Sequence, residues 1–154
     1  MDLKDFLSES LRIEGIYREP TPEEIEATIK FLSLKIPTIA DMIDLVAVYA
    51  PGRLIRNQTG MNVSVGSYSP PRGGPEIISR LLDLLERVRQ REYSPYEAHF
   101  QYEQLHPFMD GNGRSGRTLW LWMMGGIAPL GFLHMFYYQT LASAEESLLV
   151  KKHK

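Results

Sequence analysis

Cysteine is absent from the 154 residues of this chain, which excludes disulfide bonds, zinc–thiolate sites and cysteine nucleophiles. A surplus of one charge is also absent, because 17 basic residues stand against 19 acidic ones, for a formal net charge of −2. Without a basic surplus, little is available to hold a nucleic-acid backbone, so we expect no nucleic-acid partner. The lack of cysteine agrees with a reducing compartment, and we expect a cytoplasmic protein.

Long apolar runs suited to a membrane are scarce as well. The N-terminus carries acidic residues early and has no uninterrupted apolar stretch, so no signal peptide is predicted. Residues 119–138 carry no fixed charge and could span a bilayer, but Gly125, Gly126, Pro129 and Gly131 interrupt the middle of the segment. We therefore expect two short buried helices joined by a turn, and no membrane partner.

Helix signals dominate what is present. Residues 21–24 and 94–97 both combine a capping Thr or Ser, a proline at the first helical position and a glutamate two residues later, the pattern of a capping box. Apolar residues recur at helical spacing over 75–90. The composition is that of one globular domain. Together the patterns predict helices over 21–34, 38–49, 75–90, 94–105, 112–124 and 131–149, with a solvated tail over 149–154.

Residues 53–68 differ from this helical pattern. Residues 61–65 alternate apolar and polar side chains, and the turn-forming Gln-Thr-Gly of 58–60 precedes them. This favours a β-hairpin, followed by a loop rich in proline and glycine over 69–74. The predicted fold is an all-α bundle that carries one small β-hairpin.

The residues with chemical potential are concentrated in residues 106–117, which read HPFMDGNGRSGR. His106 can accept a proton from a hydroxyl near neutral pH. Asp110 can hold the Mg²⁺ that accompanies a polyphosphate. A base and a metal ligand four residues apart suggest chemistry on a phosphorylated substrate.

The second half of this segment predicts an anion site. Gly111, Asn112 and Gly113 open a predicted helix, and glycines at a helix N-terminus let backbone N–H groups approach an anion closely. Arg114 and Arg117 lie three residues apart on one helix face, where they can bind successive phosphates. With the base and the metal ligand, these residues describe phosphate-anhydride chemistry.

Other interpretations fit the segment less well. An EF-hand loop would need acidic ligands where Arg114 and Leu121 stand. A P-loop needs a Gly-Lys-Ser/Thr sequence that is missing, and Glu103-x-x-His106 lacks the second Glu-x-x-His of a di-iron bundle. An ordinary turn between helices leaves the histidine and both arginines unexplained.

The segment resembles the Fic (filamentation induced by cyclic AMP) signature, His-x-Phe-x-(Asp/Glu)-Gly-Asn-Gly-Arg-x-x-Arg, at every fixed position. This resemblance implies an all-helical fold with a β-hairpin flap beside the active site. It also implies transfer of AMP from ATP to a Tyr, Thr or Ser hydroxyl of a target protein, with Mg²⁺ as the metal. The target would dock at the flap by adding a strand, and self-modification is possible.

By position, the resemblance implies a role for each residue of the motif. His106 matches the base that deprotonates the target hydroxyl, Asp110 the Mg²⁺ ligand, and Phe108 an aromatic that holds the loop from the core. Pyrophosphate would be the leaving group.

The remaining positions imply the nucleotide site. Asn112 and the backbones of Gly111 and Gly113 match the anion hole around the α- and β-phosphates. Arg114 matches the β-phosphate contact and Arg117 the γ-phosphate contact. The related Doc-type kinases carry lysine in place of the second glycine, so Gly113 favours transfer of AMP over transfer of phosphate.

The N-terminus carries one more pattern. Residues 10–15, SLRIEG, fit the Fic inhibitory motif (Ser/Thr)-x-x-x-Glu-(Gly/Asn). The resemblance implies that residues 1–20 form an inhibitory helical segment in front of a catalytic domain over 21–148. Ser10 and Glu14 would lie on one helix face, and Glu14 would pair with Arg117.

Several remaining residues have an ordinary interpretation. We interpret His99 as a core or hydrogen-bonding histidine, and Trp120, Trp122 and the aromatic run 136–138 as core rather than as an adenine pocket. Two alternatives to AMP transfer stay open: removal of AMP from a modified protein, with Glu14 positioning the attacking water, and a catalytically idle binding module.

Overall fold

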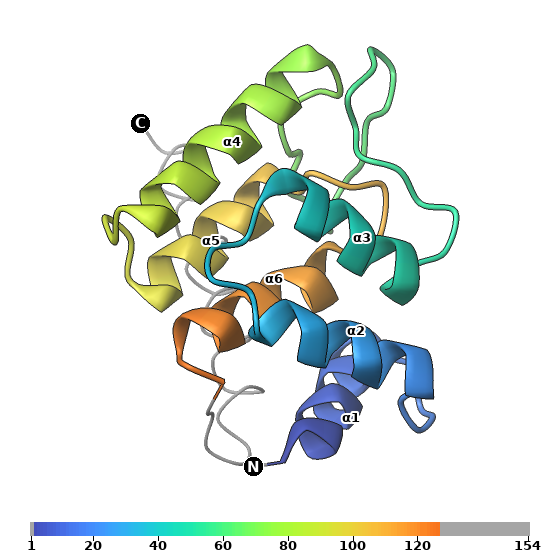
Figure 1. The fold of residues 1–154 in the computed structure, drawn as a ribbon. Coiled ribbons are helices and arrows are strands. Elements are labelled where there is room, and N and C mark those ends of the chain that lie inside the picture. The colour runs from blue at the N-terminus through green and yellow to red at the C-terminus, as the bar shows by residue number, and fades with distance from the viewer. Residues whose placement is uncertain (1, 127–154) are drawn as a thin grey trace.

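Six α-helices make up the regular structure of residues 2–126, the part of the chain that the computed structural model describes (Figure 1). They confirm the predicted all-α fold. The bounds of α2 to α6 agree with the predicted ranges to within two residues. The expected helix over 131–149 and the expected tail lie outside the described residues. The helices are α1 (Leu3–Ile13), α2 (Pro22–Leu32), α3 (Ile39–Tyr49), α4 (Pro75–Arg89), α5 (Pro95–Leu105) and α6 (Asn112–Met123).

Local capping fixes where several helices begin. At α2 the Thr21 hydroxyl accepts from the Glu24 backbone N–H at 3.1 Å, and the Thr21 N–H donates to the Glu24 carboxylate at 2.8 Å, which completes the predicted capping box. At α5 the Ser94 hydroxyl accepts from the Glu97 N–H at 3.1 Å. Each bond satisfies an N–H that a helix start would otherwise leave without a partner.

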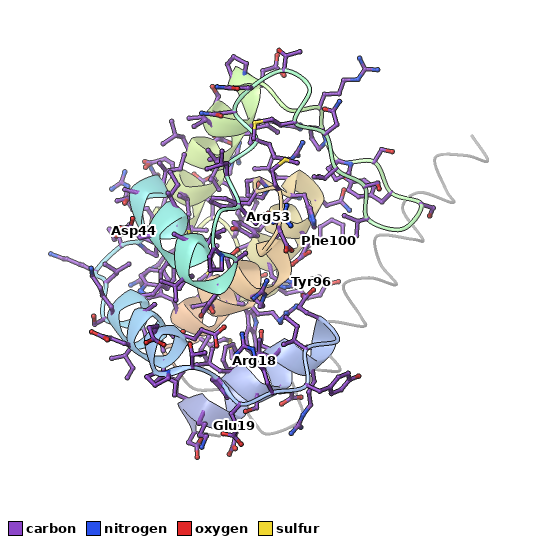
Figure 2. All side chains as sticks on the ribbon, turned by 90° about the vertical axis from the view of Figure 1, so that its right-hand side faces the viewer. Arg18, Glu19, Asp44, Arg53, Tyr96 and Phe100 are labelled. Carbon is purple, nitrogen blue, oxygen red and sulfur yellow. The ribbon has the colours of Figure 1, made fainter. Side chains whose placement is uncertain are left out.

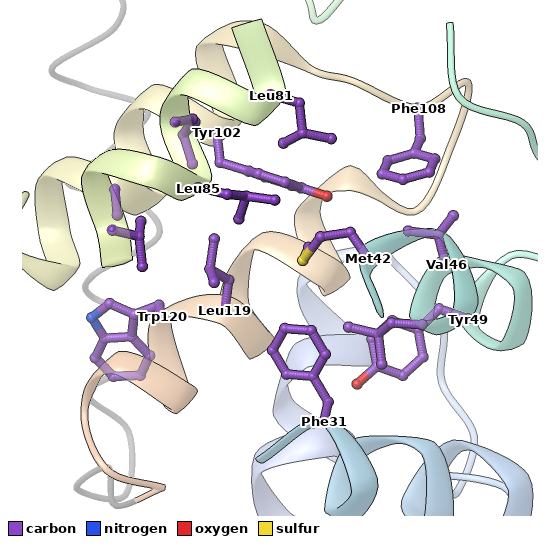
Figure 3. Close-up of a cluster of buried hydrophobic side chains, with 14 of the residues drawn as sticks. Phe31, Met42, Val46, Tyr49, Leu81, Leu85, Tyr102, Phe108, Leu119 and Trp120 are labelled. Carbon is purple, nitrogen blue, oxygen red and sulfur yellow. The ribbon is translucent and has the colours of Figure 1, made fainter. Parts of the chain in front are cut away.

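Helix α6 lies at the centre of the bundle and contacts α1, α2, α3 and α5 (Figure 1). Nine of its 12 residues are buried. Its close approach to α5 depends on Gly116, because a Cβ at this position would lie 2.9 Å from the Tyr102 ring. The apolar core that surrounds α6 includes Phe31, Met42, Val46, Tyr49, Leu81, Leu85, Tyr102, Phe108, Leu119 and Trp120 (Figure 3).

The β-hairpin expected over 53–68 is not confirmed. Within residues 2–126 this segment forms no strand, and its one internal pairing is an antiparallel bridge between Val65 and Tyr68, whose two hydrogen bonds are both 2.9 Å. Backbone groups of the expected strand have other partners, because the Met61 and Asn62 N–H groups donate to the carbonyls of Gln58 and Gly60 in local turns. The Met61 carbonyl accepts from Arg56, and the Asn62 side chain accepts from the Gly73 N–H.

The residues at the start of this loop are nevertheless hydrogen bonded to the 106–117 segment. Ile55 pairs with Phe108 in an antiparallel bridge. On either side of it, the Arg56 N–H donates to the Pro107 carbonyl and the Met109 N–H donates to the Leu54 carbonyl, both at 2.9 Å. The residues that open the loop and those that follow His106 therefore form one short paired unit.

No helix among residues 2–126 is long and apolar enough to cross a membrane. The apolar segment 119–138 runs past the described residues, so the expected break at Pro129 and Gly131 lies outside them.

One buried hydroxyl connects three helices and provides a test of the packing. The Tyr49 hydroxyl is hydrogen bonded to Thr28 Oγ1 at 2.5 Å and to Thr118 Oγ1 at 2.8 Å. Tyr49→Phe removes both bonds from a buried site, so we expect urea denaturation to show a loss of about 1–3 kcal/mol in the free energy of unfolding. Tyr17→Phe is the matched control, because Tyr17 is 81% exposed. Equal stability of the two variants would contradict the prediction.

Candidate active site

Arg117 of α6 is fully buried, and its hydrogen bonds join α6 to α1. Its Nε donates to Ser10 Oγ at 2.8 Å, and its Nη2 donates to the Ser10 carbonyl at 3.0 Å and to Glu14 Oε1 at 2.7 Å. Ser10 is buried in α1, and Glu14 is the residue at which α1 ends. The contact that the sequence motif led us to expect between Glu14 and Arg117 is thus present.

The Glu14 carboxylate reaches the first turn of α6. A Cβ added at Gly113 would lie only 2.1 Å from Glu14 Oε1, so the carboxylate rests directly on this glycine. Gly111 caps α6 with φ of 81°, a left-handed conformation suited to glycine, and no side chain caps the helix. Uncapped N–H groups and the positive end of the helix dipole favour an anion here, and the Glu14 carboxylate lies against this turn.

The Asn112 side chain makes two hydrogen bonds to the loop that precedes α6. Its Oδ1 accepts from the Phe108 N–H and its Nδ2 donates to the Phe108 carbonyl, both at 2.8 Å. The amide therefore closes the loop between α5 and α6 and holds Phe108, which is buried in the core as expected. The backbone N–H of Asn112 lies in the first turn of α6, at the anion site.

Arg114 lies beneath α1 together with Arg117. It is 8% exposed, and its guanidinium donates to the Tyr49 carbonyl at the end of α3. It shares a small cavity with Ser10 and Leu11 of α1. Helix α1 therefore covers both arginines of the motif in this conformation.

His106 ends α5 with a left-handed backbone, φ 50° and ψ 62°. Its Nδ1 lies 3.2 Å from the Glu103 carbonyl oxygen. Because a carbonyl can only accept, Nδ1 carries the hydrogen and Nε2 keeps its lone pair. Burial lowers the pKa of the imidazole from its ordinary value, the Glu103 carbonyl opposes this shift, and Arg56 lowers the pKa further. The ring is a neutral base at pH 7.

Sequence reasoning did not identify Glu103 as part of this site. Its Oε1 lies 3.7 Å from His99 Nε2, and its Oε2 lies 4.0 Å from His106 Nδ1. Burial raises the pKa of Glu103 to about 7, with Arg117 lowering it and Glu14 raising it. The spacing of residues 99, 103 and 106 along one helix could have indicated this cluster.

His99 and the tryptophans belong to the core, as interpreted from the sequence. His99 is fully buried, and burial lowers its pKa to about 3, so the ring is neutral at pH 7. Trp120 is buried, and Trp122 donates from its indole nitrogen to the Leu34 carbonyl at 2.9 Å. The aromatic run 136–138 lies outside the described residues.

Asp110 is exposed beside this turn, and its Oδ1 accepts from the Gly111 N–H at 2.7 Å. The described part of the chain contains no group of three or more metal-ligating side chains. A single exposed carboxylate next to an anion site does not build a metal cage, but it fits Mg²⁺, which is commonly held by one carboxylate and the phosphates of a substrate.

Comparison with known proteins places this site in a family. Residues 39–124, more than half of the chain, match the Fic/DOC family, and the chain belongs to it. The match covers α3 to α6, including the whole 106–117 segment, but not α1.

Curated relatives from fruit flies carry the name "Protein adenylyltransferase Fic". The proteins of Drosophila melanogaster and Drosophila sechellia are each 34% identical over 110 residues, which cover 60% of this chain and 21% of the relative. The Drosophila persimilis protein is 34% identical over 111 residues, with 60% and 20% covered. This chain thus spans about a fifth of the length of these relatives.

The raised pKa of Glu103 gives a test based on pH. The pKa is about 7 in the folded chain and ordinarily near 4.5, so between these values the folded state holds a proton that the unfolded state releases. The contribution of Glu103 to wild-type stability therefore falls through this window as pH rises. The glutamine of Glu103→Gln cannot ionise. We therefore expect the stability of this variant relative to wild type to rise by a few kcal/mol between pH 4.5 and 7, at about 1.4 kcal/mol per pKa unit, and to stay constant above pH 7.

Urea denaturation at pH 4 to 8 measures this difference. Glu26→Gln is the matched control, because Glu26 is exposed on α2. A stability difference for Glu103→Gln that does not change with pH would show that this carboxyl has no raised pKa.

Proposed function

We propose that this chain transfers AMP from ATP to a hydroxyl side chain of a target protein, and that α1 inhibits the reaction. Membership of the Fic/DOC family and the printed name of the fruit-fly relatives support the activity. The observation that carries the proposal is the Glu14 carboxylate lying on Gly113 and bonded to Arg117, because it marks a ready anion site beside a neutral histidine.

The chemistry follows from the groups that surround this turn. The target hydroxyl oxygen attacks the α-phosphorus, the bond from that phosphorus to the bridging oxygen of the β-phosphate breaks, and pyrophosphate leaves. Nε2 of His106 takes the hydroxyl proton, because Nδ1 already carries a hydrogen. The N–H groups of the α6 first turn, with Arg114 and Arg117, stabilise negative charge on the phosphates.

Asp110 would hold Mg²⁺ in this proposal, and the ion would supply charge neutralisation for the departing pyrophosphate. The loop over 53–68 would present the target chain, since its base is paired with the residues next to His106. Exposed tyrosines make self-modification possible, and Tyr17, which is 81% exposed, is one candidate.

Inhibition follows from competition for Arg117. The γ-phosphate would need the guanidinium that Ser10 and Glu14 bind here. While Glu14 is in place, ATP could enter only with its α-phosphate out of line for attack. A misplacement of about 1 Å can cost about 10²-fold in rate.

The base assignment gives the first test of the function. His106→Ala should reduce AMP transfer from α-labelled ATP by about 10²-fold or more, because a general base contributes at least this much. ATP affinity, measured by calorimetry, should stay within a few-fold, since the imidazole acts on the hydroxyl. Retention of more than about a tenth of the rate would contradict the assignment.

The inhibitory contact gives the second test. Glu14→Gly should raise the initial rate of adenylylation by about one to two orders of magnitude, because it frees Arg117 for the γ-phosphate. Arg117→Ala should not mimic this effect, since it removes the phosphate contact as well. Glu19→Gly is the matched control: Glu19 is exposed on the α1–α2 connection (Figure 2), and its carboxylate pairs with exposed Lys4 at 2.9 Å.

A pre-modified target separates AMP transfer from the alternative reaction. If Glu14→Gly transfers AMP no faster than wild type, inhibition by α1 is wrong. If wild type releases AMP from a modified protein and Glu14→Gly does not, Glu14 positions water, and the chain removes AMP instead.

A further inference from the structure

Arg56 is a fully buried arginine in the loop that follows α3. Its guanidinium donates to four backbone carbonyls: those of Leu105 at 2.8 Å, His106 at 2.6 Å, Met61 at 3.1 Å and Pro71 at 2.8 Å. Within residues 2–126 no carboxylate pairs with it. An arginine side chain stays charged inside a protein. The buried cation is therefore compensated by the dipoles of these backbone carbonyls.

Two of the four carbonyls are at the end of α5, where a helix leaves its last carbonyls without partners. Arg56 satisfies the carbonyl of the last helical residue, Leu105, and that of the following residue, His106. A cation here also suits the negative end of the helix dipole. The left-handed backbone of His106, which is unfavourable for a residue with a Cβ, is thereby fixed from outside the helix.

The other two carbonyls belong to the two sides of the loop between α3 and α4. Met61 lies on the outgoing side and Pro71 on the returning side, and both are bonded through the same Nη1. The Arg56 backbone adds two more ties, with its N–H donating to the Pro107 carbonyl at 2.9 Å and its carbonyl accepting from the Gly74 N–H at 3.0 Å. Arg56 thus joins both sides of the loop to the turn that carries His106.

We propose that Arg56 is a positioning residue that holds the loop 57–73 and the His106 imidazole in one fixed arrangement, so that a hydroxyl presented by the loop meets the base. This inference rests on the proposed function. In this proposal, Arg56, which lies outside the 106–117 segment, sets the distance between the target hydroxyl and the His106 imidazole. Arg56 contacts neither reactant.

The nucleotide site should be independent of this arrangement. Arg114 donates its hydrogen bond to α3, and Arg117 donates to the α1 segment. None of these observed partners is shared with Arg56. Loss of Arg56 should therefore slow the transfer step and leave ATP binding unchanged. A general loss of structure would disturb both.

The experiment compares Arg56→Met, which removes the charge and all four bonds, with Arg56→Lys, which keeps the charge and can reach only part of the acceptors. In the active Glu14→Gly background, Arg56→Met should lower kcat for a protein hydroxyl by about 10²-fold, as expected for a misplaced base. KM for ATP should change by less than about threefold. The kcat of Arg56→Lys should lie between those of Arg56→Met and the Glu14→Gly parent. Arg72→Met is the matched control, because Arg72 is exposed in the same loop.

Hydrogen exchange gives a readout that does not need activity. In Arg56→Met the amides of Met109 and Gly74, which bond to Leu54 and Arg56 across the base of the loop, should exchange at least about tenfold faster than in wild type. Amides in the middle of α6 should keep their protection. Arg72→Met should change none of them.

Three outcomes would overturn the proposal. The first is a folded Arg56→Met protein with kcat within about threefold of its parent. The second is a rise in KM for ATP as large as the fall in kcat, in both Arg56 variants. The third is unchanged exchange at Met109 and Gly74. If Arg56→Met does not fold, Arg56→Lys decides by the same measurements. If the parent transfers no AMP, the proposed function fails, and the exchange comparison alone decides the role of Arg56.

Discussion

A buried guanidinium needs fixed partners, and Arg117 finds them on α1. Leaving this charge without partners in the interior would cost several kcal/mol, so α1 and α6 must pack in one register. The partners are Ser10, through its hydroxyl and its carbonyl, and the Glu14 carboxylate. In the proposed function, the same contacts also keep Arg117 from a phosphate, so the packing of α1 and the inhibition have one cause.

The remaining geometry follows from how deeply α6 is buried. This helix is polar at its start, yet most of its residues are enclosed by four other helices. Gly116 allows α5 to approach, and the Asn112 amide closes the intervening loop on Phe108. A histidine at the end of one helix and arginines at the start of the next are thereby held at a set separation before any ligand binds. Preorganisation of this kind lets fixed dipoles act on a developing charge without rearrangement.

Much of this arrangement could be predicted from the sequence because its causes are local. Capping residues and proline at helix starts located α2 and α5, and apolar spacing located α4. The Glu14–Arg117 pair was expected because both partners lie in recognisable motifs, although 103 residues separate them in the chain.

The features that escaped prediction have non-local causes. Alternation over 61–65 suggested a hairpin, but a ladder also needs free backbone partners, and the Met61 carbonyl is bonded to Arg56 instead. Arg56 itself carries no sequence signal, since its acceptors are carbonyls, which every residue possesses. Asn112 was assigned to the anion site from the family resemblance, and the two bonds of its amide to Phe108 depend on loop geometry that the sequence does not show.

The placement of the tryptophans has an optical consequence. The chain contains two, and both lie on α6, within eight residues of Arg114 and Arg117. Trp120 is 1% exposed in the core, whereas Trp122 is partly exposed and hydrogen bonded to the connection after α2. Indole emission from this protein therefore originates entirely from the helix that carries the anion site. Native fluorescence, without an added label, therefore reports on the surroundings of that helix.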